Sequence, residues 1–150
     1  MIIRQPHADE VEAMLALFAR DVAAGLMLPR PADEVRQQLD RWLVAEQGGQ
    51  VIGCASLVYY NGSLAEVRSL AVHPDWRGNG IASQLVAEAV VMARGRGLKR
   101  VLTLTRAARL FEQLGFERDA VTNFPIKVWQ DCAPCPFKDR CDEVALVYEE

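Results

Sequence analysis

The sequence predicts an α/β protein in which helices cover a mixed β-sheet. Segments with strand character alternate with segments of helical periodicity, which is the pattern of this class. The 150 residues are 51% hydrophobic and carry a net charge of −3, a composition that supports a folded core. We find no repeat, low-complexity segment or linker in the chain. We therefore expect one continuous domain over residues 1–150.

The N-terminal part predicts a short strand and two helices. The strand covers residues 1–4 and ends before Pro6. A first helix carries apolar side chains at helical spacing, at Val11, Leu15 and Phe18. Pro29 and Pro31 then break the chain. We expect Asp33 to cap a second helix, whose apolar face is formed by Val35, Leu39 and Leu43.

Three strands are predicted next, as a meander. Two β-like runs, 42–46 and 51–60, flank a glycine turn at residues 47–50. Asn61-Gly62 is the strongest short hairpin signal in the chain, and it joins the second run to a third at residues 64–72. The meander ends at His73, before Pro74 and Asp75.

The remaining residues predict two helices and three strands. The helices are expected at residues 81–94 and 107–114, and the strands at residues 100–105, from 116 onward and at 144–148. Leu85, Ala89 and Met92 lie on one face of the longer helix, which stops at Gly95 and Gly97. Gly115 is expected to cap the C-terminus of the shorter helix.

Charge and hydropathy argue against two classes of function. The pI near 5.5 does not suit general nucleic-acid binding, which needs a basic face. The most apolar helical stretch, Leu85 to Ala93, is interrupted by Glu88 and is far shorter than the ~20 residues that cross a bilayer. The N-terminus shows no export signal, so we expect a cytoplasmic protein whose cysteines are reduced thiols.

The stretch from Leu70 to Ala82 is suited to bind an anion. A strand ends there, the chain turns through two glycines, and a helix begins at once. The first N–H groups of a helix have no partner within it, and glycines allow the backbone to approach phosphate oxygens closely. The spacing fits neither a P-loop nor the G-x-G-x-x-G fingerprint. A plain strand-to-helix turn is the alternative interpretation.

Two motifs resemble those of the GNAT (GCN5-related) N-acetyltransferases. Residues 72–82, V-H-P-D-W-R-G-N-G-I-A, closely resemble the family's acetyl-CoA loop, V-x-P-x-[YW]-R-G-x-G-[IV]-[GA]. Residues 108–116, A-R-L-F-E-Q-L-G-F, resemble its helix and Gly-Phe turn. The expected order of helices and strands is also that of the family, so the resemblance covers nearly the whole chain.

This resemblance implies a GNAT fold, with a mixed, mostly antiparallel central sheet flanked by helices. It implies acetyl-CoA as co-substrate and no tightly bound cofactor. The pantetheine arm of CoA is expected to pair with Leu70, Ala71 and Val72 like an added strand. The CoA pyrophosphate is expected to bind backbone N–H groups of Arg77, Gly78, Asn79, Gly80, Ile81 and Ala82.

Three further segments resemble the short N-acetylglutamate synthase-like acetyltransferases. They are residues 25–30, residues 66–72, and residues 125–135 continuing to residues 141–143. This subgroup converts L-glutamate, or in some members L-glutamine, to its N-acetyl form at the start of arginine biosynthesis. The resemblance therefore implies an amino-acid N-acetyltransferase.

An amino-acid acceptor presents a carboxylate, so its site needs cations. The resemblance assigns Arg30 and Lys127 to the α-carboxylate, with Leu28 beside them in the acceptor site. Arg68, on the strand before the glycine loop, is our candidate for a side-chain carboxylate. Solvated surface charges are the alternative for each of these cations.

Acetyl transfer by direct attack of the amine needs a base, because an α-amine is mostly protonated at neutral pH. Glu66 is our candidate, acting through a water molecule; a solvent-exposed edge-strand glutamate is the alternative. His73 is a second, weaker candidate. A backbone N–H near Leu70 to Val72 is expected to hold the oxyanion.

The departing thiolate needs a proton less urgently, since thiols leave readily. Many GNAT enzymes supply a tyrosine on the helix before Gly-Phe, but this chain has Phe111 there. Thr105, at the end of its strand, is our candidate to position a water molecule or the thiol.

Cys132, Cys135 and Cys141 form a C-x2-C-x5-C pattern. Soft thiolates at this spacing can hold zinc, but structural sites usually have four ligands and the fourth is not evident. Reduced thiols in a tight turn, or a labile disulfide, are the alternatives. We assign no metal to the catalytic site.

The expected partners are small molecules, acetyl-CoA and an amino acid, with no nucleic acid and no membrane. A homodimer is possible. The alternatives are a GNAT enzyme for another small amine or a protein amine, and a non-catalytic acyl-CoA-binding sensor. The acidic pI favours a small anionic acceptor over a basic peptide.

Overall fold

A computed structural model describes residues 1–124 and 143–149. The strands are β1 (Ile2–Arg4), β2 (Trp42–Gln47), β3 (Gln50–Tyr59), β4 (Leu64–Val72), β5 (Arg100–Thr105), β6 (Glu117–Asp119) and β7 (Val144–Glu149). The helices are α1 (Val11–Leu17), α2 (Ala19–Ala23), α3 (Ala32–Gln37), α4 (Ile81–Gly95) and α5 (Ala108–Gln113), with short 3-10 turns at Ala8–Glu10, Leu39–Arg41, Pro74–Trp76 and Val121–Asn123.

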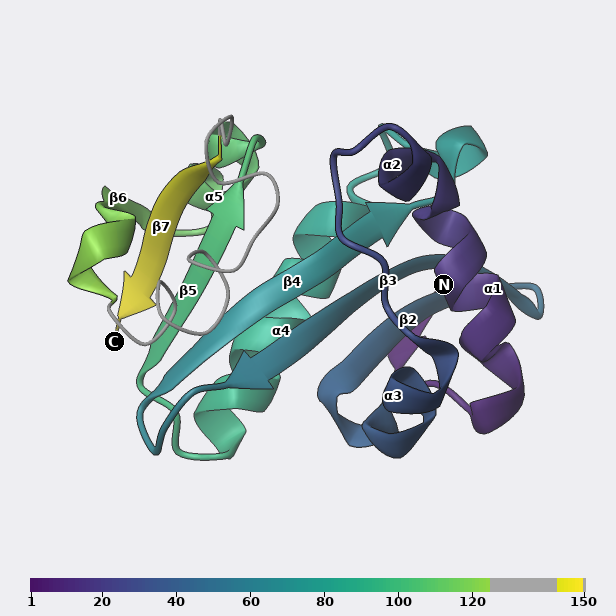
Figure 1. Ribbon diagram of the computed structural model, residues 1–150, viewed down its shortest axis with the longest axis horizontal. Helices are drawn as coiled ribbons and strands as arrows, with labels where there is room; N and C mark the ends of the chain where they lie inside the picture. The colour runs from purple at the N-terminus through teal and green to yellow at the C-terminus, as the bar shows by residue number, and fades with distance from the viewer. Residues whose placement is uncertain (125–142, 150) are drawn as a thin grey trace. The chain divides into compact units, whose positions relative to one another are not determined.

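The described strands form one seven-stranded sheet in the order β1-β2-β3-β4-β5-β7-β6 (Figure 1). β4 and β5 pair in parallel, whereas β1–β2, β2–β3, β5–β7 and β6–β7 pair antiparallel. The mixed, mostly antiparallel sheet expected from the sequence is therefore confirmed. The chain divides into two compact units, a first unit of Met1–Leu57 with Val67–Ala89 and a second unit of Val58–Glu66 with Val90–Glu150.

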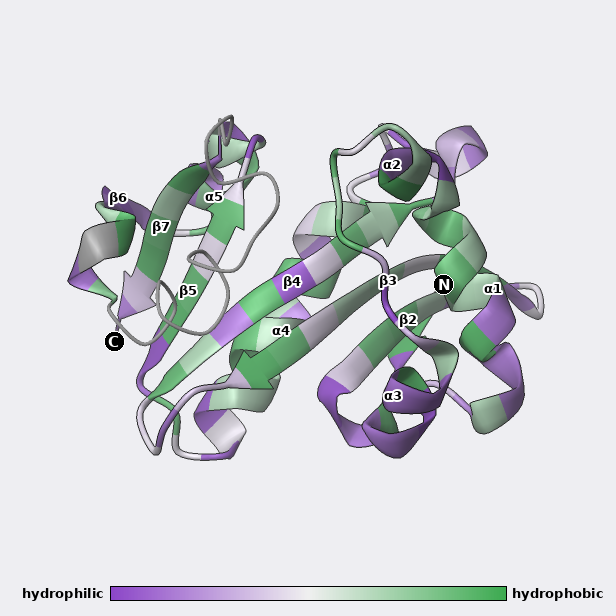
Figure 2. Ribbon diagram, in the orientation of Figure 1, coloured by the Kyte–Doolittle hydropathy of each residue, from purple (hydrophilic) through white to green (hydrophobic). Residues whose placement is uncertain are grey.

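In the first unit, α1 and α3 cover one face of the strands. Their buried side chains pack with those of β2, β3 and β4 in one cluster, formed by Val11, Met14, Phe18, Val35, Trp42, Val44, Val51, Cys54 and Ala71. α3 contributes only Val35 to this buried cluster, and Figure 2 shows the helix mostly hydrophilic on the side turned to the viewer. The two helices therefore lie on the sheet as amphipathic covers.

Three details of these helices differ from the sequence prediction. α3 ends at Gln37, so Leu39 lies in the following 3-10 turn and Leu43 in β2, not on the face of the helix. The first helix is interrupted at Phe18, whose φ of −116° and ψ of 12° are not helical, and resumes as α2. α3 has no side-chain cap: Pro31 occupies the N-cap position, and Asp33 lies inside the helix, where it pairs with Arg36 at 3.4 Å. Proline at this position gives the backbone its extended entry without a side-chain acceptor.

The opposite face of β3 in the first unit is covered by the first turns of α4. A Cβ atom on Gly53 would lie 3.0 Å from Leu85 Cδ1, 3.2 Å from Ile81 Cγ2 and 3.3 Å from the Ala71 carbonyl oxygen. Glycine is thus required at residue 53 for helix and strand to approach this closely. This contact fixes where α4 begins, directly after the glycine loop.

The second unit holds the β3–β4 turn and the C-terminal strands. The Asn61 side chain accepts hydrogen bonds from the backbone of Ser63 (2.8 Å) and Leu64 (3.0 Å), and Tyr60 N donates to the Leu64 carbonyl at 3.0 Å. The hairpin expected at Asn61-Gly62 is therefore confirmed. Its turn is held by the asparagine side chain as an Asx turn.

α5 contacts β6 and β7 in the same unit. The Phe111 ring meets Phe116 edge to face, with 5.1 Å between ring centroids, and Phe116 lies 5.5 Å from Tyr148. Gly115 follows the helix C-cap residue Leu114 in a left-handed conformation, φ +95°. Gly115 thus sits one position beyond the cap itself, where glycine is commonest.

Among the helices that the structure describes, none combines the length and the apolar character needed to span a membrane.

Candidate functional site

The glycine loop of the first unit is tied at both ends. His73 N donates to the Ile52 carbonyl of β3 at 2.7 Å, and Arg77 Nε donates to the Val72 carbonyl at 3.3 Å. Within the loop, Asn79 Nδ2 donates to the Trp76 carbonyl at 2.9 Å. The loop therefore has a defined path from β4 into α4, as a preformed binding loop requires.

Gly78 and Gly80 have φ values of +83° and +76°, in the left-handed region that L side chains rarely adopt. Among the residues that the structure describes, and apart from its chain neighbours, a Cβ atom on either glycine would meet no heavy atom within 4 Å. The backbone here is consequently open to an approaching group. The first helical hydrogen bond runs from Gln84 N to the Gly80 carbonyl, at 3.1 Å, so the N–H groups of the first turn precede any helical acceptor.

His73 serves the loop and is poorly placed as a base. Its Nδ1 atom accepts a 3.1 Å hydrogen bond from Asp75 N and so caps the 3-10 turn that follows. A nitrogen that accepts this backbone donor has its lone pair engaged. The weaker of the two sequence candidates for proton transfer thus has a structural role.

Ser69, in β4, has a φ of +53°, the positive value that glycine normally takes. Its hydroxyl accepts a 3.2 Å hydrogen bond from Arg30 Nε. β3 supplies further support, because Ser56 Oγ donates to the Arg68 carbonyl at 3.1 Å and Cys54 Sγ lies 3.6 Å from the Ser69 carbonyl. Side chains of β3 thus contact the carbonyl groups of Arg68 and Ser69, next to the positive φ of Ser69.

Of the predicted acceptor residues of the first unit, Arg30 contacts Ser69 through a hydrogen bond, and Arg68 directly precedes Ser69 in β4. Arg30 follows half-buried Leu28 in the connection between α2 and α3, and its hydrogen bond brings the guanidinium beside β4. Arg68 precedes Ser69, is partly buried, and has a buried Nε atom. Leu70, Ala71 and Val72, predicted to pair with the cofactor, follow Ser69 directly.

Glu66, in the second unit, is 2% exposed, so it is not the solvent-exposed glutamate that was the alternative. Tyr60, 9% exposed, donates a 2.5 Å hydrogen bond from its hydroxyl to Glu66 Oε1. A buried carboxylate needs such donors, because burial without them is costly. Tyr60 and Ser69 were not among the residues predicted from the sequence. Tyr60 could have been found from the hairpin register, whereas no sequence signal marks the φ of Ser69.

The second unit also holds Thr105 and Phe111. Thr105 is half-buried, and its Oγ1 accepts a 2.9 Å hydrogen bond from Ala107 N before α5. Its hydroxyl proton remains a donor in this arrangement. Phe111 is 1% exposed and packs in the core. Its side chain thus has a structural role and offers no hydroxyl.

Cys54 is unsuited to act as a nucleophile. It is fully buried in β3 of the first unit, and desolvation raises the pKa of its thiol to about 12. The thiolate is the reactive form of cysteine, so this thiol stays inert at neutral pH. Lys127 and Cys132, Cys135 and Cys141 lie outside the described residues.

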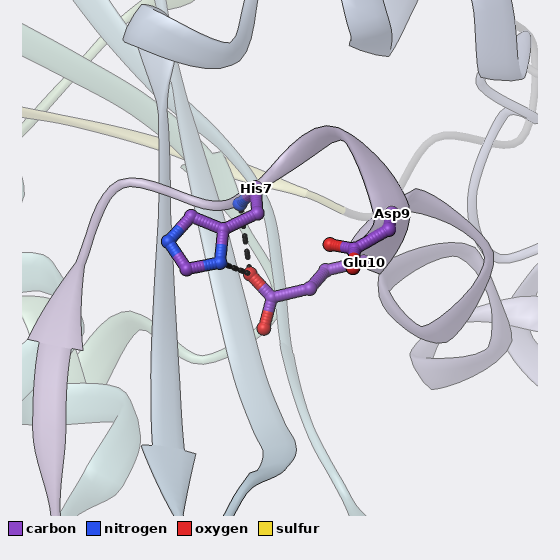
Figure 3. A group of neighbouring side chains, drawn as sticks. All are labelled: His7, Asp9 and Glu10. Atoms are coloured by element: carbon purple, nitrogen blue, oxygen red, sulfur yellow. Dashed lines mark hydrogen bonds and ion pairs between the residues drawn. The ribbon is translucent and has the colours of Figure 1, made fainter.

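His7, Asp9 and Glu10 bring possible metal-ligand atoms together before α1, as Figure 3 shows. Glu10 is already engaged: both its carboxylate oxygens accept 2.9 Å hydrogen bonds from Arg4, and Oε1 also accepts one of 2.8 Å from His7 N. The Arg4 hydrogen bonds are the main reason why the pKa of Glu10 falls to about 2. The cluster is best explained as the capping of this turn.

Comparison with known proteins adds the family. Residues 38–118 match the model of the acetyltransferase (GNAT) domain. The chain is 33% identical over 145 residues to an uncharacterised N-acetyltransferase of Chlorobaculum tepidum, which covers 97% of this chain and 94% of that protein. It is 30% identical over 126 residues to the amino-acid acetyltransferase of Aeromonas salmonicida, covering 83% of this chain and 28% of that enzyme. The chain thus spans less than a third of the latter's length.

Among solved structures, N-acetylglutamate synthase from Neisseria gonorrhoeae, complexed with coenzyme A and N-acetyl-glutamate, is similar. The two share a TM-score of 0.83 at 24% identity, over 99% of this chain and 34% of that chain. At this identity the likeness concerns the fold alone, and it agrees with the sheet and helices described above.

Proposed function

The chain belongs to the GNAT acetyltransferase family, and from that premise we propose that it transfers the acetyl group of acetyl-CoA to the α-amine of L-glutamate. The product is N-acetylglutamate, for arginine biosynthesis. The similarity to an amino-acid acetyltransferase supports this substrate class.

The hydrogen bond from Arg30 to Ser69 is the observation that carries the proposal. It holds a cation from the α2–α3 connection against β4 at Ser69, which lies in sequence between Arg68 and the residues predicted to pair with CoA. Guanidinium groups bind carboxylates through two parallel N–H donors. Arg30 is proposed for the α-carboxylate of the acceptor and Arg68 for its side-chain carboxylate.

The glycine loop fits the CoA pyrophosphate. Its two left-handed glycines leave open space where side chains would stand, and the first turn of α4 offers N–H donors and partial positive charge. Leu70 to Val72 then lead from the acceptor residues into this loop. The pantetheine arm is proposed to run along these three residues.

The reaction proposed is direct transfer. Glu66 accepts, through a water molecule, the proton that the ammonium group must lose. The amine lone pair then attacks the thioester carbonyl carbon, and a backbone N–H near Leu70 to Val72 stabilises the oxyanion. As the C=O bond re-forms, the C–S bond breaks and the CoA thiolate leaves. The second proton of the attacking nitrogen passes to this thiolate, which gives the amide and CoA thiol. Since burial keeps the Cys54 thiol protonated, Cys54 is not proposed as an acyl carrier.

Thr105 is proposed to assist the leaving thiolate. Its hydroxyl accepts from Ala107 N and can still donate one hydrogen bond. The buried Phe111 offers no proton at the position where many relatives carry tyrosine. Because thiolates leave readily, an ordered donor suffices here.

The test is thiol release from acetyl-CoA with each of the twenty amino acids offered singly. Release with L-glutamate is expected, and its ratio to release with L-glutamine reports whether a charge is recognised at the side-chain end. Release only with another amine would contradict the glutamate assignment. No release with any of the twenty amino acids, while acetyl-CoA still binds, would contradict the amino-acid assignment and leave a different acceptor or a sensor.

Glu66→Gln separates an enzyme from a sensor. An enzyme should lose turnover by about 100-fold, the size of a general-base contribution, and keep its affinity for CoA. A sensor should be indifferent to the change. The homodimer and the cytoplasmic location expected from the sequence stay predictions; sedimentation of the purified protein would decide the first.

A further inference from the structure

Tyr60 and Glu66 form a buried polar pair, of which only Glu66 has a role in the proposed reaction. Both side chains are almost inaccessible, and the distance from Tyr60 Oη to Glu66 Oε1 is 2.5 Å. Hydroxyl donors reach this separation when the acceptor is a carboxylate. The hydroxyl therefore restricts the orientation of the Glu66 carboxyl group.

The backbone on either side of this pair is itself fixed. Tyr60 N donates to the Leu64 carbonyl at 3.0 Å, which closes the hairpin, and the Asn61 side chain holds the turn between them. This register makes residues 60 and 66 diagonal neighbours across the hairpin, within reach of a long aromatic side chain. The turn thus determines where the tyrosine hydroxyl lies.

Apolar packing fixes the ring. Tyr60 belongs to a buried cluster of the second unit that also contains Leu64, Leu102, Phe124 and Ala145. The ring is held by these contacts and the hydroxyl by the carboxylate, so the side chain has little freedom to rotate. A rigid donor of this kind can orient a carboxylate that must meet a water molecule at a defined angle.

We propose that Tyr60 is a positioning residue for Glu66, which it holds in the orientation that accepts the proton of the acceptor amine. This rests on the proposed function, in which Glu66 is the base. Tyr60 contributes to turnover through Glu66 alone. It has no part in the glycine loop, so CoA binding does not depend on it.

The test compares Tyr60→Phe with Tyr59→Phe. Both changes remove one hydroxyl from neighbouring residues, but Tyr59 is hydrogen-bonded to Arg96 and its ring lies under that guanidinium, 5.5 Å from ring centroid to Cζ. Tyr60→Phe should lower kcat about tenfold, the lower range for a hydrogen bond to a charged group, with KM for acetyl-CoA unchanged. Tyr59→Phe should match the wild type in both constants.

A double-mutant cycle tests the coupling. In a Glu66→Gln background, adding Tyr60→Phe should change kcat by about twofold or less, because the base it positions is gone. A tenfold loss in both backgrounds would overturn the proposal, as would equal kcat values for Tyr60→Phe and Tyr59→Phe. If the wild type acetylates no amine, the proposed function fails and this role fails with it. If it acetylates an amine, either of these results is a failure of the Tyr60 role alone.

Proton NMR gives a readout that does not depend on turnover. A buried hydroxyl bonded to a carboxylate should show a downfield resonance, protected from exchange with water. Tyr60→Phe should remove it and Tyr59→Phe should keep it. If Tyr60→Phe does not fold, Glu66→Gln serves instead, since a neutral acceptor should move the resonance upfield. Absence of any such resonance in the wild type would overturn the proposal.

Discussion

Arg30 Nε lies 3.2 Å from the hydroxyl of Ser69, and Ser69 is, within the part of the chain that the structure describes, the non-glycine residue with a positive φ. The positive φ of Ser69 explains how its hydroxyl can reach Arg30. A left-handed residue in a strand turns its side chain away from the regular alternation of faces. The hydroxyl thereby becomes an acceptor for a side chain that arrives from another part of the chain.

Ser69→Ala removes this acceptor and keeps the strained φ, whereas Ser69→Gly removes both. We expect Ser69→Ala to lower the free energy of unfolding by about 1 kcal/mol, the value of one hydrogen bond. Ser69→Gly should lose less, because glycine relieves a left-handed conformation that costs about 1–2 kcal/mol. Denaturant unfolding of the three proteins would measure this order, and a less stable Ser69→Gly would contradict it.

The Arg30–Ser69 hydrogen bond should also affect binding of the amino-acid acceptor. Without Ser69 Oγ the Arg30 guanidinium loses one of the contacts that orient it, so Ser69→Ala should raise KM for the amino acid about fivefold, equivalent to about 1 kcal/mol. KM for acetyl-CoA should not change. Ser63→Ala is the control, because it removes a hydroxyl from the exposed β3–β4 turn, where Ser63 Oγ contacts Asn61. An unchanged acceptor KM in Ser69→Ala would separate Arg30 from substrate binding.

Gly53→Ala should destabilise the first unit. The new methyl group would stand 3.0 Å from Leu85 Cδ1 and 3.3 Å from the Ala71 carbonyl oxygen, so α4 and β3 would have to move apart. Overpacking of this kind costs about 1–3 kcal/mol, measurable by denaturant unfolding. Gly62→Ala is the matched control, since nothing lies within 4 Å of its Cβ position. Equal stabilities of the two variants would show that α4 adapts without cost.

The free energy of unfolding should fall in acid, because the Glu10 carboxylate becomes protonated. The Arg4 guanidinium holds the pKa of Glu10 at about 2, against an ordinary value of 4.5. A carboxyl whose folded pKa is depressed stabilises the protein above its unfolded pKa, and that contribution disappears as the pH falls from 4.5 towards 2. Above this pH window, the free energy of unfolding of the wild type should exceed that of Glu10→Gln by on the order of 2 kcal/mol. Within the window the difference should shrink as the pH falls.

Chemical unfolding at a series of pH values would measure the difference. Glu12→Gln is the control. Glu12 pairs with Arg36, but its side chain is 69% exposed, and an exposed pair contributes little. A difference between wild type and Glu10→Gln that does not vary with pH would contradict the assignment.

How far the sequence could predict this molecule depends on the range of the interactions involved. The hairpin at Asn61, the turn through Gly78 and Gly80, and the long helix after it follow from residues close in the chain, and each was predicted. The break at Phe18 and the missing cap at Asp33 were not, since local rules favoured a continuous helix and a carboxylate cap. Tertiary packing and Pro31 decided otherwise.

In the candidate site, too, features set by nearby residues could be predicted, whereas those set by distant residues could not. The loop could be identified from its glycines, and Glu66 and Arg68 from their places on one strand. The φ of Ser69 could not, because no local sequence signal marks it, and the partner of its hydroxyl, Arg30, lies 39 residues away in the chain. The pairing of Tyr60 with Glu66 lies between these cases. The hairpin register implies it, but only once Tyr60 and Leu64 are known to be partners.

Gly78→Ala tests the cofactor loop most directly. Gly78 and Gly49 have the same φ of +83°, and at neither would a Cβ atom lie within 4 Å of other described parts of the chain beyond its neighbours. Alanine should therefore cost both sites about the same conformational energy, about 1–2 kcal/mol. Only at Gly78 would the methyl group occupy the space proposed for phosphate oxygens. Gly49 lies in the β2–β3 turn, outside the loop.

We expect Gly78→Ala to raise KM for acetyl-CoA about tenfold, which corresponds to about 1.4 kcal/mol, and Gly49→Ala to leave it unchanged. Gly80→Ala, at φ +76°, should behave like Gly78→Ala. Steady-state kinetics would measure KM for acetyl-CoA, and equilibrium binding would measure the Kd of CoA. Because the two variants are matched in backbone strain, a loss of affinity confined to the loop cannot arise from general destabilisation. Equal affinities would place the pyrophosphate elsewhere and remove the main support for the loop's assignment.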